Sequence, residues 1–331
     1  MPQPRFLMRR KGWFLSQAGA RVASVEWNCD KMRVSRGSVP SGVLAPLTTP
    51  FDSHGEIDEA AFRAEVEWLV AGGVDGVVIG GSTGEGYALS PDELERLVRL
   101  AFDVVSDGVQ VVAGIIADSS RAAASIAASL DRFPLTAIQV TPPHYIFAPD
   151  DDGMVDFYTA VAAATSAPLV IYNVIPWLQL SPILVERIMR AHPRVIGVKH
   201  SQKKLESYRA LVDCIGADRA FAAIDNRLAD CYAIGAAGSI AAISAAVPSA
   251  SVRLHRAVRA GDTAAASELA VFLEAVWQSL DGPNLPARVK AAQAAQGMAS
   301  GYARAPMREV SEAERAAIAE VLRRLPALGV T

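Results

Sequence analysis

The stretch that decides the fold is Val195-Ile196-Gly197-Val198-Lys199. Four apolar or small residues run without interruption into a lysine, which is typical of a parallel strand buried on both faces. The last residue then places an ammonium group at the carboxyl end of a buried strand. A charge is costly there unless a partner compensates it or its pKa falls. Taken alone, the run fits a lysine that reaches solvent or a lysine that forms a Schiff base with a ketone.

The same pattern repeats along most of the chain, with short apolar segments alternating with segments of helical spacing. Strands are predicted at residues 42–48, 76–79, 109–115, 137–140, 168–172, 195–199, 220–224 and 239–243. Helices are predicted at residues 57–71, 90–101, 119–130, 154–164, 181–191, 205–215, 227–234 and 249–260. Because strictly alternating strands and helices pair in parallel, these units predict class α/β and a closed (β/α)8 TIM barrel. A doubly wound open sheet is the alternative, but no Gly-x-Gly-x-x-Gly follows the first strand.

Three regions of the chain differ in composition. Residues 1–40 carry eight lysines and arginines against two acids and lack the hydrophobic segment of a secretory signal. We expect either a basic, flexible N-terminal arm or upstream sequence included by the choice of a start codon before Met32. Residues 41–260 hold the barrel. Residues 261–331 contain only predicted helices, at 263–280, 285–296 and 311–325, and are expected to form a C-terminal three-helix extension.

Composition excludes several classes of function. The net charge of −3 gives no reason to expect nucleic acid or an anionic membrane as a partner. No apolar run approaches the ~20 residues of a transmembrane helix. Three cysteines without metal or redox spacing suit a reducing cytoplasm, and the five histidines show no zinc-binding spacing, so no metal site is predicted.

Residues that follow the strands of such a barrel at their carboxyl ends face the active site. The second strand is followed by Gly81-Ser82-Thr83-Gly84-Glu85, whose backbone amides and hydroxyls suit a small carboxylate, although a plain structural turn is equally compatible. His144 and Tyr145 follow the fourth strand. Tyr172 ends the fifth strand, where a tyrosine is more often a core residue than a catalyst, and Lys199 ends the sixth.

Together these groups are more specific than any one of them. A lysine can form an imine with a 2-keto acid, and a phenol within reach can carry protons to and from the imine and enamine. Hydroxyls and amides can hold the carboxylate of the keto acid. These are the parts of a class I aldolase.

At this point the chain from about residue 42 to 325 resembles the dihydrodipicolinate synthase and N-acetylneuraminate lyase family. The matching features are Gly81-Ser82-Thr83-Gly84-Glu85, Tyr172-Asn173-Val174, the run that ends at Lys199, and the three closing helices. The resemblance implies a TIM barrel with a helical C-terminal extension, assembled as a homotetramer or homodimer. It also implies a small 2-keto acid, pyruvate or a relative, as substrate, and no cofactor beyond the covalent lysine imine.

The resemblance further implies a role for each candidate residue. Lys199 forms the Schiff base and Tyr172 carries protons. The candidate substrate-binding residues are Gly81, Ser82, Thr83, His144, Tyr145, Asp225 and Ser239. In this set His144 or Tyr145 takes the place of a tyrosine that reaches across a dimer, and Asp225 matches an acid that contacts polyhydroxyl substrates in sialate lyases.

The chain departs from the family pattern near the second substrate. Synthases that take aspartate semialdehyde usually carry an arginine two residues past the proline that follows Tyr-Asn-Val, but here Leu178 holds that place. His200 stands where those synthases commonly have glutamate, and Asn226 follows Asp225 in place of glutamate. We therefore expect a Schiff-base lyase with an unresolved partner substrate. The alternatives are dihydrodipicolinate synthesis proper, a 2-keto-3-deoxy sugar acid aldolase or dehydratase, and a non-catalytic barrel that binds a keto acid and regulates another process.

Overall fold

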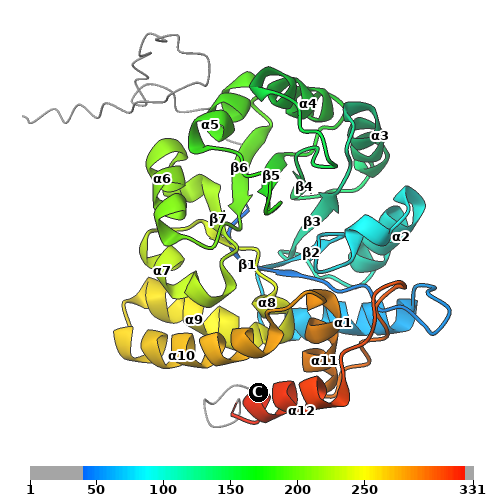
Figure 1. The fold of residues 1–331 in the computed structure, drawn as a ribbon, viewed down its shortest axis with the longest axis vertical. Helices are drawn as coiled ribbons and strands as arrows, with labels where there is room; N and C mark the ends of the chain where they lie inside the picture. Colours follow the sequence, from blue (N-terminus) through cyan, green and yellow to red (C-terminus); the bar gives the residue numbers. More distant parts are fainter. Residues whose placement is uncertain (1–39, 325–331) are drawn as a thin grey trace, which may run out of the picture. The chain divides into compact units, whose positions relative to one another are not determined.

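A computed structural model describes residues 40–324, in which eight parallel strands close into a barrel (Figure 1). The strands follow one another around the barrel in chain order. They are β1 Gly42–Pro46, β2 Gly76–Ile79, β3 Gln110–Ile115, β4 Ala137–Val140, β5 Leu169–Asn173, β6 Val195–His200, β7 Ala220–Ala222 and β8 Gly238–Ser239. The predicted (β/α)8 barrel of class α/β is confirmed. The predicted arm lies, apart from Pro40, outside the described residues.

Helices surround the strands in the order that the sequence predicts (Figure 1). Several begin at side-chain caps, and Ser90 forms a reciprocal capping box with Glu93 at the start of α2. The helices are α1 Glu59–Ala71, α2 Pro91–Phe102, α3 Ser120–Leu130, α4 Asp151–Ala163, α5 Pro182–Ala191, α6 Leu205–Ile215, α7 Leu228–Ala233, α8 Ile243–Ala246 and α9 Pro248–Ala260. Short 3-10 turns are η2 Gly86–Ala88, η3 Ala217–Arg219 and η4 Asp225–Arg227.

Two apolar clusters form the core, one on each face of the sheet. The larger cluster fills the space between strands and helices. The smaller cluster fills the barrel interior and takes residues from all around the sheet, which are Leu44, Val78, Val112, Ala137, Val170, Ile196, Phe221 and Ile240. Because side chains alternate along a strand, a residue next to a member of one cluster faces the other side of the sheet.

The barrel closes between β8 and β1, where two glycines lie side by side. Gly42 pairs with Gly238, and a Cβ atom on Gly238 would come within 2.0 Å of the carbonyl oxygen of Gly42. The predicted strand 239–243 is wrong beyond Ser239, because Ile243 already begins α8. That stretch is buried throughout, and a short buried apolar run does not distinguish a strand from a helix.

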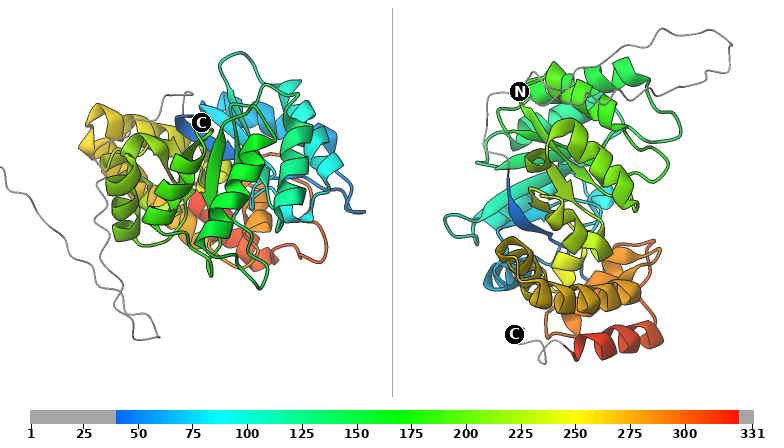
Figure 2. Two further views of the ribbon diagram at one scale, coloured as in Figure 1. Left: turned by 90° about the horizontal axis from the view of Figure 1, so that it is seen from above. Right: turned by 90° about the vertical axis from the view of Figure 1, so that its left-hand side faces the viewer.

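The three predicted closing helices are present. They are α10 Thr263–Leu280, α11 Leu285–Ala294 and α12 Glu312–Leu322. Helix α10 packs against α9 and α12, and α11 packs against α8 and α12, so the extension lies against the part of the barrel where β8 meets β1 (Figures 1 and 2). Within residues 40–324, no helix is long and apolar enough to cross a membrane.

Candidate functional site

The site centres on a cross-strand pair, Tyr172 of β5 and Lys199 of β6. The two residues are partners in the register of these strands, and the Nζ atom of Lys199 lies 4.1 Å from the centre of the Tyr172 ring. Lys199 is 5% exposed and Tyr172 is 1% exposed, so both functional groups are largely removed from water. The neighbouring Val198 belongs to the outer cluster, which places Lys199 on the inner face.

Ser82 fixes the phenol of Tyr172. The Tyr172 hydroxyl accepts a hydrogen bond from the Ser82 backbone N–H at 3.2 Å and donates one to the Ser82 Oγ atom at 3.0 Å. Burial alone raises the pKa of the Tyr172 phenol, but the positive charge of Lys199 and the hydrogen bonds from Ser82 outweigh burial and lower the pKa below 10. A phenol with a lowered pKa, beside an amine, is suited to proton transfer.

The loop that carries Ser82 depends on glycines at two close approaches. A Cβ atom on Gly86 would lie 1.9 Å from the Gly80 carbonyl oxygen, and one on Gly81 would lie 3.0 Å from the Gln139 Nε2 atom and in contact with the Tyr172 hydroxyl. The structure therefore brings Gly81 and Ser82 together with Tyr172, as the sequence predicts. Thr83, the next residue along the loop, is buried.

Asp225 lies at the carboxyl end of β7, in the 3-10 turn η4. Its Oδ1 atom accepts a hydrogen bond from the Ile243 N–H at 2.8 Å, which ties this turn to the start of α8. Burial raises the pKa of the Asp225 carboxyl to about 6, against the opposing effects of that N–H and of the charge of Lys199. Asp225 is thus close enough to Lys199 to interact with it electrostatically.

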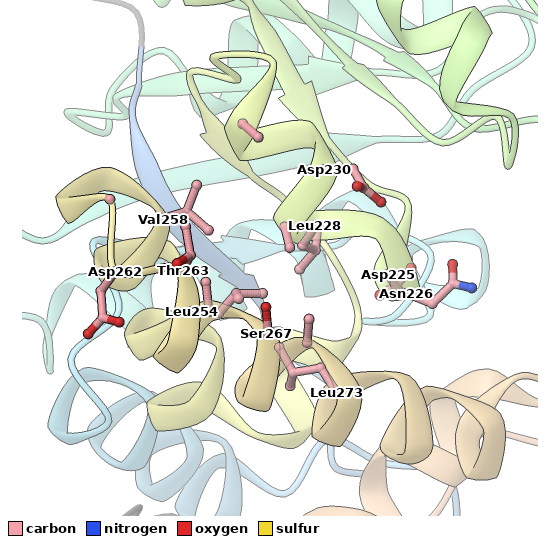
Figure 3. Close-up of a pocket in the computed structure, with 15 residues that line it drawn as sticks. Asp225, Asn226, Leu228, Asp230, Leu254, Val258, Asp262, Thr263, Ser267 and Leu273 are labelled. Atoms are coloured by element: carbon pink, nitrogen blue, oxygen red, sulfur yellow. The ribbon is translucent and has the colours of Figure 1, made fainter.

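Asp225 also borders a groove outside the barrel. Figure 3 shows Asp225 and Asn226 at one end of this groove and Asp262 and Thr263 at the other. The groove, of about 510 Å³, runs between α7, α9 and α10 and is lined mainly by apolar side chains such as Leu228. Neither Lys199 nor Tyr172 lines it, so this groove is separate from the candidate site around those two residues.

His144 and Tyr145 lie in the loop after β4, which is hydrogen-bonded to the two neighbouring loops. The backbone N–H groups of both residues donate to the Asp118 Oδ1 atom, at 2.5 Å and 2.9 Å. The indole N–H of Trp177 donates to the His144 carbonyl oxygen at 3.0 Å. Tyr145 is 71% exposed, and with Trp177 it faces solvent at the rim of the site.

Ser239 corrects one sequence-based prediction. Its hydroxyl accepts a hydrogen bond from the Tyr232 hydroxyl of α7 at 2.7 Å, and both side chains are buried. Because Ile240 belongs to the inner cluster, Ser239 points toward the helices and away from the barrel interior. The expected substrate contact by Ser239 is therefore wrong, and this hydroxyl joins β8 to α7 instead.

Asn173 and His200 form the matching pair on the outer face of β5 and β6. Asn173 binds both the N–H and the carbonyl of Leu180, which closes the loop between β5 and α5. The His200 Nε2 atom lies 3.0 Å from the Ser207 hydroxyl of α6, and burial lowers the pKa of His200 to about 4. The residue after the family lysine therefore faces α6 and not the substrate.

Two polar residues, one on β4 and one just after it, were not among the site residues predicted from the sequence. Gln139 and Thr141 are fully buried, and their side-chain polar atoms have no hydrogen-bond partner among residues 40–324. A Cβ atom on Gly81 would lie 3.0 Å from the Gln139 Nε2 atom, which places this amide beside the Ser82 loop. A glutamine inside the apolar run 137–140 was the available signal. No cluster of His, Cys, Asp or Glu in this described part of the chain could hold a metal ion.

A parallel eight-stranded barrel with a lysine at the end of β6, beside a tyrosine at the end of β5, defines a class I, Schiff-base-forming lyase. Residues 39–325 match the profile of the Dihydrodipicolinate synthetase family. The chain belongs to this family and is an enzyme of its class I lyase type.

Curated relatives of the chain are about 30% identical to it. The 4-hydroxy-tetrahydrodipicolinate synthase of Acidiphilium cryptum is 31% identical over 280 residues, which cover 83% of this chain and 94% of the relative. That of Sorangium cellulosum is 34% identical over 292 residues, covering 87% and 96%. Among solved structures, dihydrodipicolinate synthase from Aquifex aeolicus has a TM-score of 0.81 at 25% identity and covers 86% of this chain and 98% of its own. A sialic acid aldolase lysine mutant from Ruminococcus gnavus shares the fold, with a TM-score of 0.81, 22% identity and coverage of 87% and 96%.

The buried His200 predicts a pH-dependent stability. Histidine in an unfolded chain titrates near 6.5, so the folded state disfavours protonation that the unfolded state accepts. The contribution of His200 to the free energy of unfolding should be fully present above pH 6.5. It should fall as the pH drops toward 4, by up to about 3 kcal/mol. The difference in free energy of unfolding between the parent and His200→Gln, measured by urea unfolding, should therefore be smaller at pH 4.5 than at pH 7.

His54 offers a matched control, because it lies on an exposed turn. His54→Gln should follow the parent at both pH values. If the difference in free energy of unfolding between the parent and His200→Gln is the same at pH 7 and pH 4.5, the prediction is contradicted.

Proposed function

We propose that this enzyme makes or breaks a carbon–carbon bond next to the carbonyl of a 2-keto acid, pyruvate or a close relative, through an imine on Lys199. The observation that carries the proposal is the pair of buried groups at the barrel mouth, with the Lys199 ammonium 4.1 Å from the Tyr172 ring centre. The family relationship supports the same chemistry.

The proposed reaction begins with proton removal from Lys199. The Tyr172 hydroxyl takes up that proton as it passes its own to the Ser82 hydroxyl, which passes a proton on to the carbonyl oxygen of the keto acid, and the neutral amine attacks C2. Loss of the carbonyl oxygen as water leaves an imine. Removal of a C3 proton, carried by Tyr172 and the Ser82 hydroxyl, gives an enamine whose C3 attacks an aldehyde; the reverse sequence cleaves the product. Since the lysine itself activates the carbonyl, we propose no cofactor.

The carboxylate of the keto acid is proposed to bind the loop that holds Gly81, Ser82 and Thr83. Glycines at both ends of this loop allow a ligand to approach the backbone amides. The buried amide of Gln139 lies beneath the same loop and adds a polar group that the substrate or a water can use.

Dihydrodipicolinate synthesis proper is the runner-up for the second substrate. The relatives named as synthases support it, but the loop from residue 174 to 181 contains no arginine to bind the carboxylate of aspartate semialdehyde. Arg187, the nearest one along the chain, lies on α5 and pairs with Asp152 of α4, in the outer helical layer.

A 2-keto-3-deoxy sugar acid is favoured by Asp225. A buried carboxylate close to Lys199 can accept hydrogen bonds from substrate hydroxyls in addition to the one from the Ile243 N–H. We therefore propose aldol cleavage or dehydration of such an acid ahead of dihydrodipicolinate synthesis.

Assembly as a homodimer or homotetramer is proposed from the rim of the site. Tyr145, Ile146, Phe147 and Trp177 are each at least 70% exposed and form an apolar rim patch across two adjacent loops. Ile146 also has a φ of 52°, a left-handed conformation that is strained for a β-branched residue. A second copy of the chain would cover these side chains.

Two proposals concern the chain outside the barrel. We propose that residues 1–40 are an arm and residues 261–331 an extension, as the composition predicts, and that the arm is dispensable for turnover.

A cytoplasmic location is proposed from the sparse, odd set of three cysteines.

Borohydride treatment with pyruvate should add one reduced pyruvyl group to Lys199, because the imine is reducible. Peptide mass spectrometry would locate the adduct, and Lys199→Ala should lack it. Tyr172→Phe should keep the fold and lower turnover ~10²–10⁴-fold, the usual contribution of proton transfer. Labelling that is unchanged in Lys199→Ala would disprove the assignment.

Asp225→Asn tests the choice of substrate. Because the Asp225 carboxyl has a pKa of about 6, kcat/KM for a 2-keto-3-deoxy sugar acid should rise as the pH increases through 6. The variant should lack this rise and be about 10–100-fold slower at pH 8, the cost of a lost charge-assisted hydrogen bond.

Asp230→Asn is the matched control, since Asp230 borders the same groove but pairs with Arg227. It should behave as the parent does. A higher kcat/KM for pyruvate with aspartate semialdehyde than for any sugar acid would reject this substrate and support the runner-up.

Light scattering should give the parent a dimeric or tetrameric mass, and a protein that starts at Met32 should keep both that mass and its turnover. Phe147→Asp should lower the mass, because it places a charge in the rim patch. Val271→Asp on α10 replaces another exposed apolar residue outside the patch and should leave the mass unchanged. A monomeric parent would refute the assembly proposal.

A further inference from the structure

A buried ion pair joins the C-terminal extension to the loop that carries Ser82. The Lys290 Nζ atom of α11 lies 2.6 Å from the Glu85 Oε1 atom, and the two side chains are 2% and 0% exposed. Neither residue touches Lys199 or Tyr172 directly. The pair therefore acts on the site through the loop that holds Ser82 and Glu85.

Every charged atom of this pair has a partner. Lys290 also donates to the Tyr302 carbonyl oxygen at 2.6 Å, and the second oxygen of Glu85 accepts the Arg304 backbone N–H at 2.9 Å. The Phe51 ring covers the pair, with its centre 5.0 Å from the Lys290 Nζ atom. A buried pair that loses one partner leaves an uncompensated charge, so both ends are held firmly in place.

Glu85 passes this constraint to the site through the backbone. It adopts a left-handed conformation, with φ of 54°, which is uncommon for a residue other than glycine and is retained when surrounding contacts fix it. The Glu85 N–H donates to the Ser82 carbonyl oxygen at 3.2 Å, and the Gly86 N–H donates to the Gly81 carbonyl oxygen at 3.0 Å. Ser82 in turn makes both hydrogen bonds to the Tyr172 hydroxyl.

We propose that Lys290 is a positioning residue: by anchoring Glu85 it sets the conformation of Gly81 and Ser82, and so the place of the substrate carboxylate and of the Tyr172 phenol. This inference rests on the proposed function. Lys290 contacts no reacting atom, and its effect falls on substrate binding and proton transfer, whereas the amine that forms the imine stays in place on β6.

The test removes both charges at once, so that no uncompensated charge remains. Glu85→Gln/Lys290→Met is compared with Glu85→Gln/Lys290→Gln, in which two amides can still hydrogen-bond to each other. Two readouts are needed: borohydride trapping of pyruvate on Lys199, and exchange of the pyruvate C3 protons in D2O followed by NMR. Glu85→Gln/Lys290→Leu is made in parallel, and variants with a Tm within about 5 °C of the parent are compared.

In the methionine and leucine variants, saturating pyruvate should still be trapped on Lys199. The exchange rate should fall roughly 10–100-fold, the usual cost of a misplaced catalytic group. The glutamine variant should recover most of this loss. Arg288→Met is the matched control, because Arg288 lies on the same helix but pairs with Glu314 of α12 and should exchange at the parent rate.

An exchange rate equal to that of the parent in a folded methionine or leucine variant would overturn the inference. It would also be overturned if the loss of exchange rate among the variants simply followed the decrease in their Tm. If instead the parent traps no pyruvate, the proposed function itself fails. The two failures are thus distinguishable.

Discussion

The alternation of side chains along two paired strands is the constraint on which the site depends. Because β5 and β6 are parallel and pair residue by residue after a register shift between Leu169 and Val170, Tyr172 meets Lys199 on the inner face and Asn173 meets His200 on the outer face. The same register therefore places the candidate catalytic pair on the inner face of the sheet and a pair with structural hydrogen bonds on the outer face. A slip of one residue would turn the lysine toward α6 and put a histidine in its place.

The second constraint is the tight loop after β2. Its glycines bring backbone amides close to the phenol, and the charge of Lys199 together with the hydrogen bonds from Ser82 lowers the pKa of this buried tyrosine. Without the Ser82 hydrogen bonds and the charge of Lys199, burial would raise the Tyr172 pKa, as it does for Tyr158 and Tyr208. The difference in pKa between Tyr172 and a core tyrosine is thus set by the neighbouring groups and not by the depth of burial.

Much of this could be predicted from the sequence, because period and length mark strands and helices well in an alternating fold. The order of the strands places Tyr172 and Lys199 on neighbouring strands, and their proximity to Ser82 follows because the carboxyl ends of all strands meet at one mouth of the barrel. Ser239 could not be placed correctly, since the side of the sheet it faces depends on where β8 begins, and an all-buried run hides that boundary. Gln139 and Lys290 were missed for a different reason: their importance lies in contacts made across the fold, which no local pattern records.

The link between Lys290 and Glu85 also has a consequence for biosynthesis. The two residues are 205 positions apart in the chain, and the later one belongs to the extension. Strands β1 to β8 leave the ribosome first, yet the loop beside Tyr172 receives its anchor only once α11 has emerged and docked. Under the proposed role of Lys290, a barrel that is released before α11 has been made carries Lys199 without this anchor for the loop that holds Ser82.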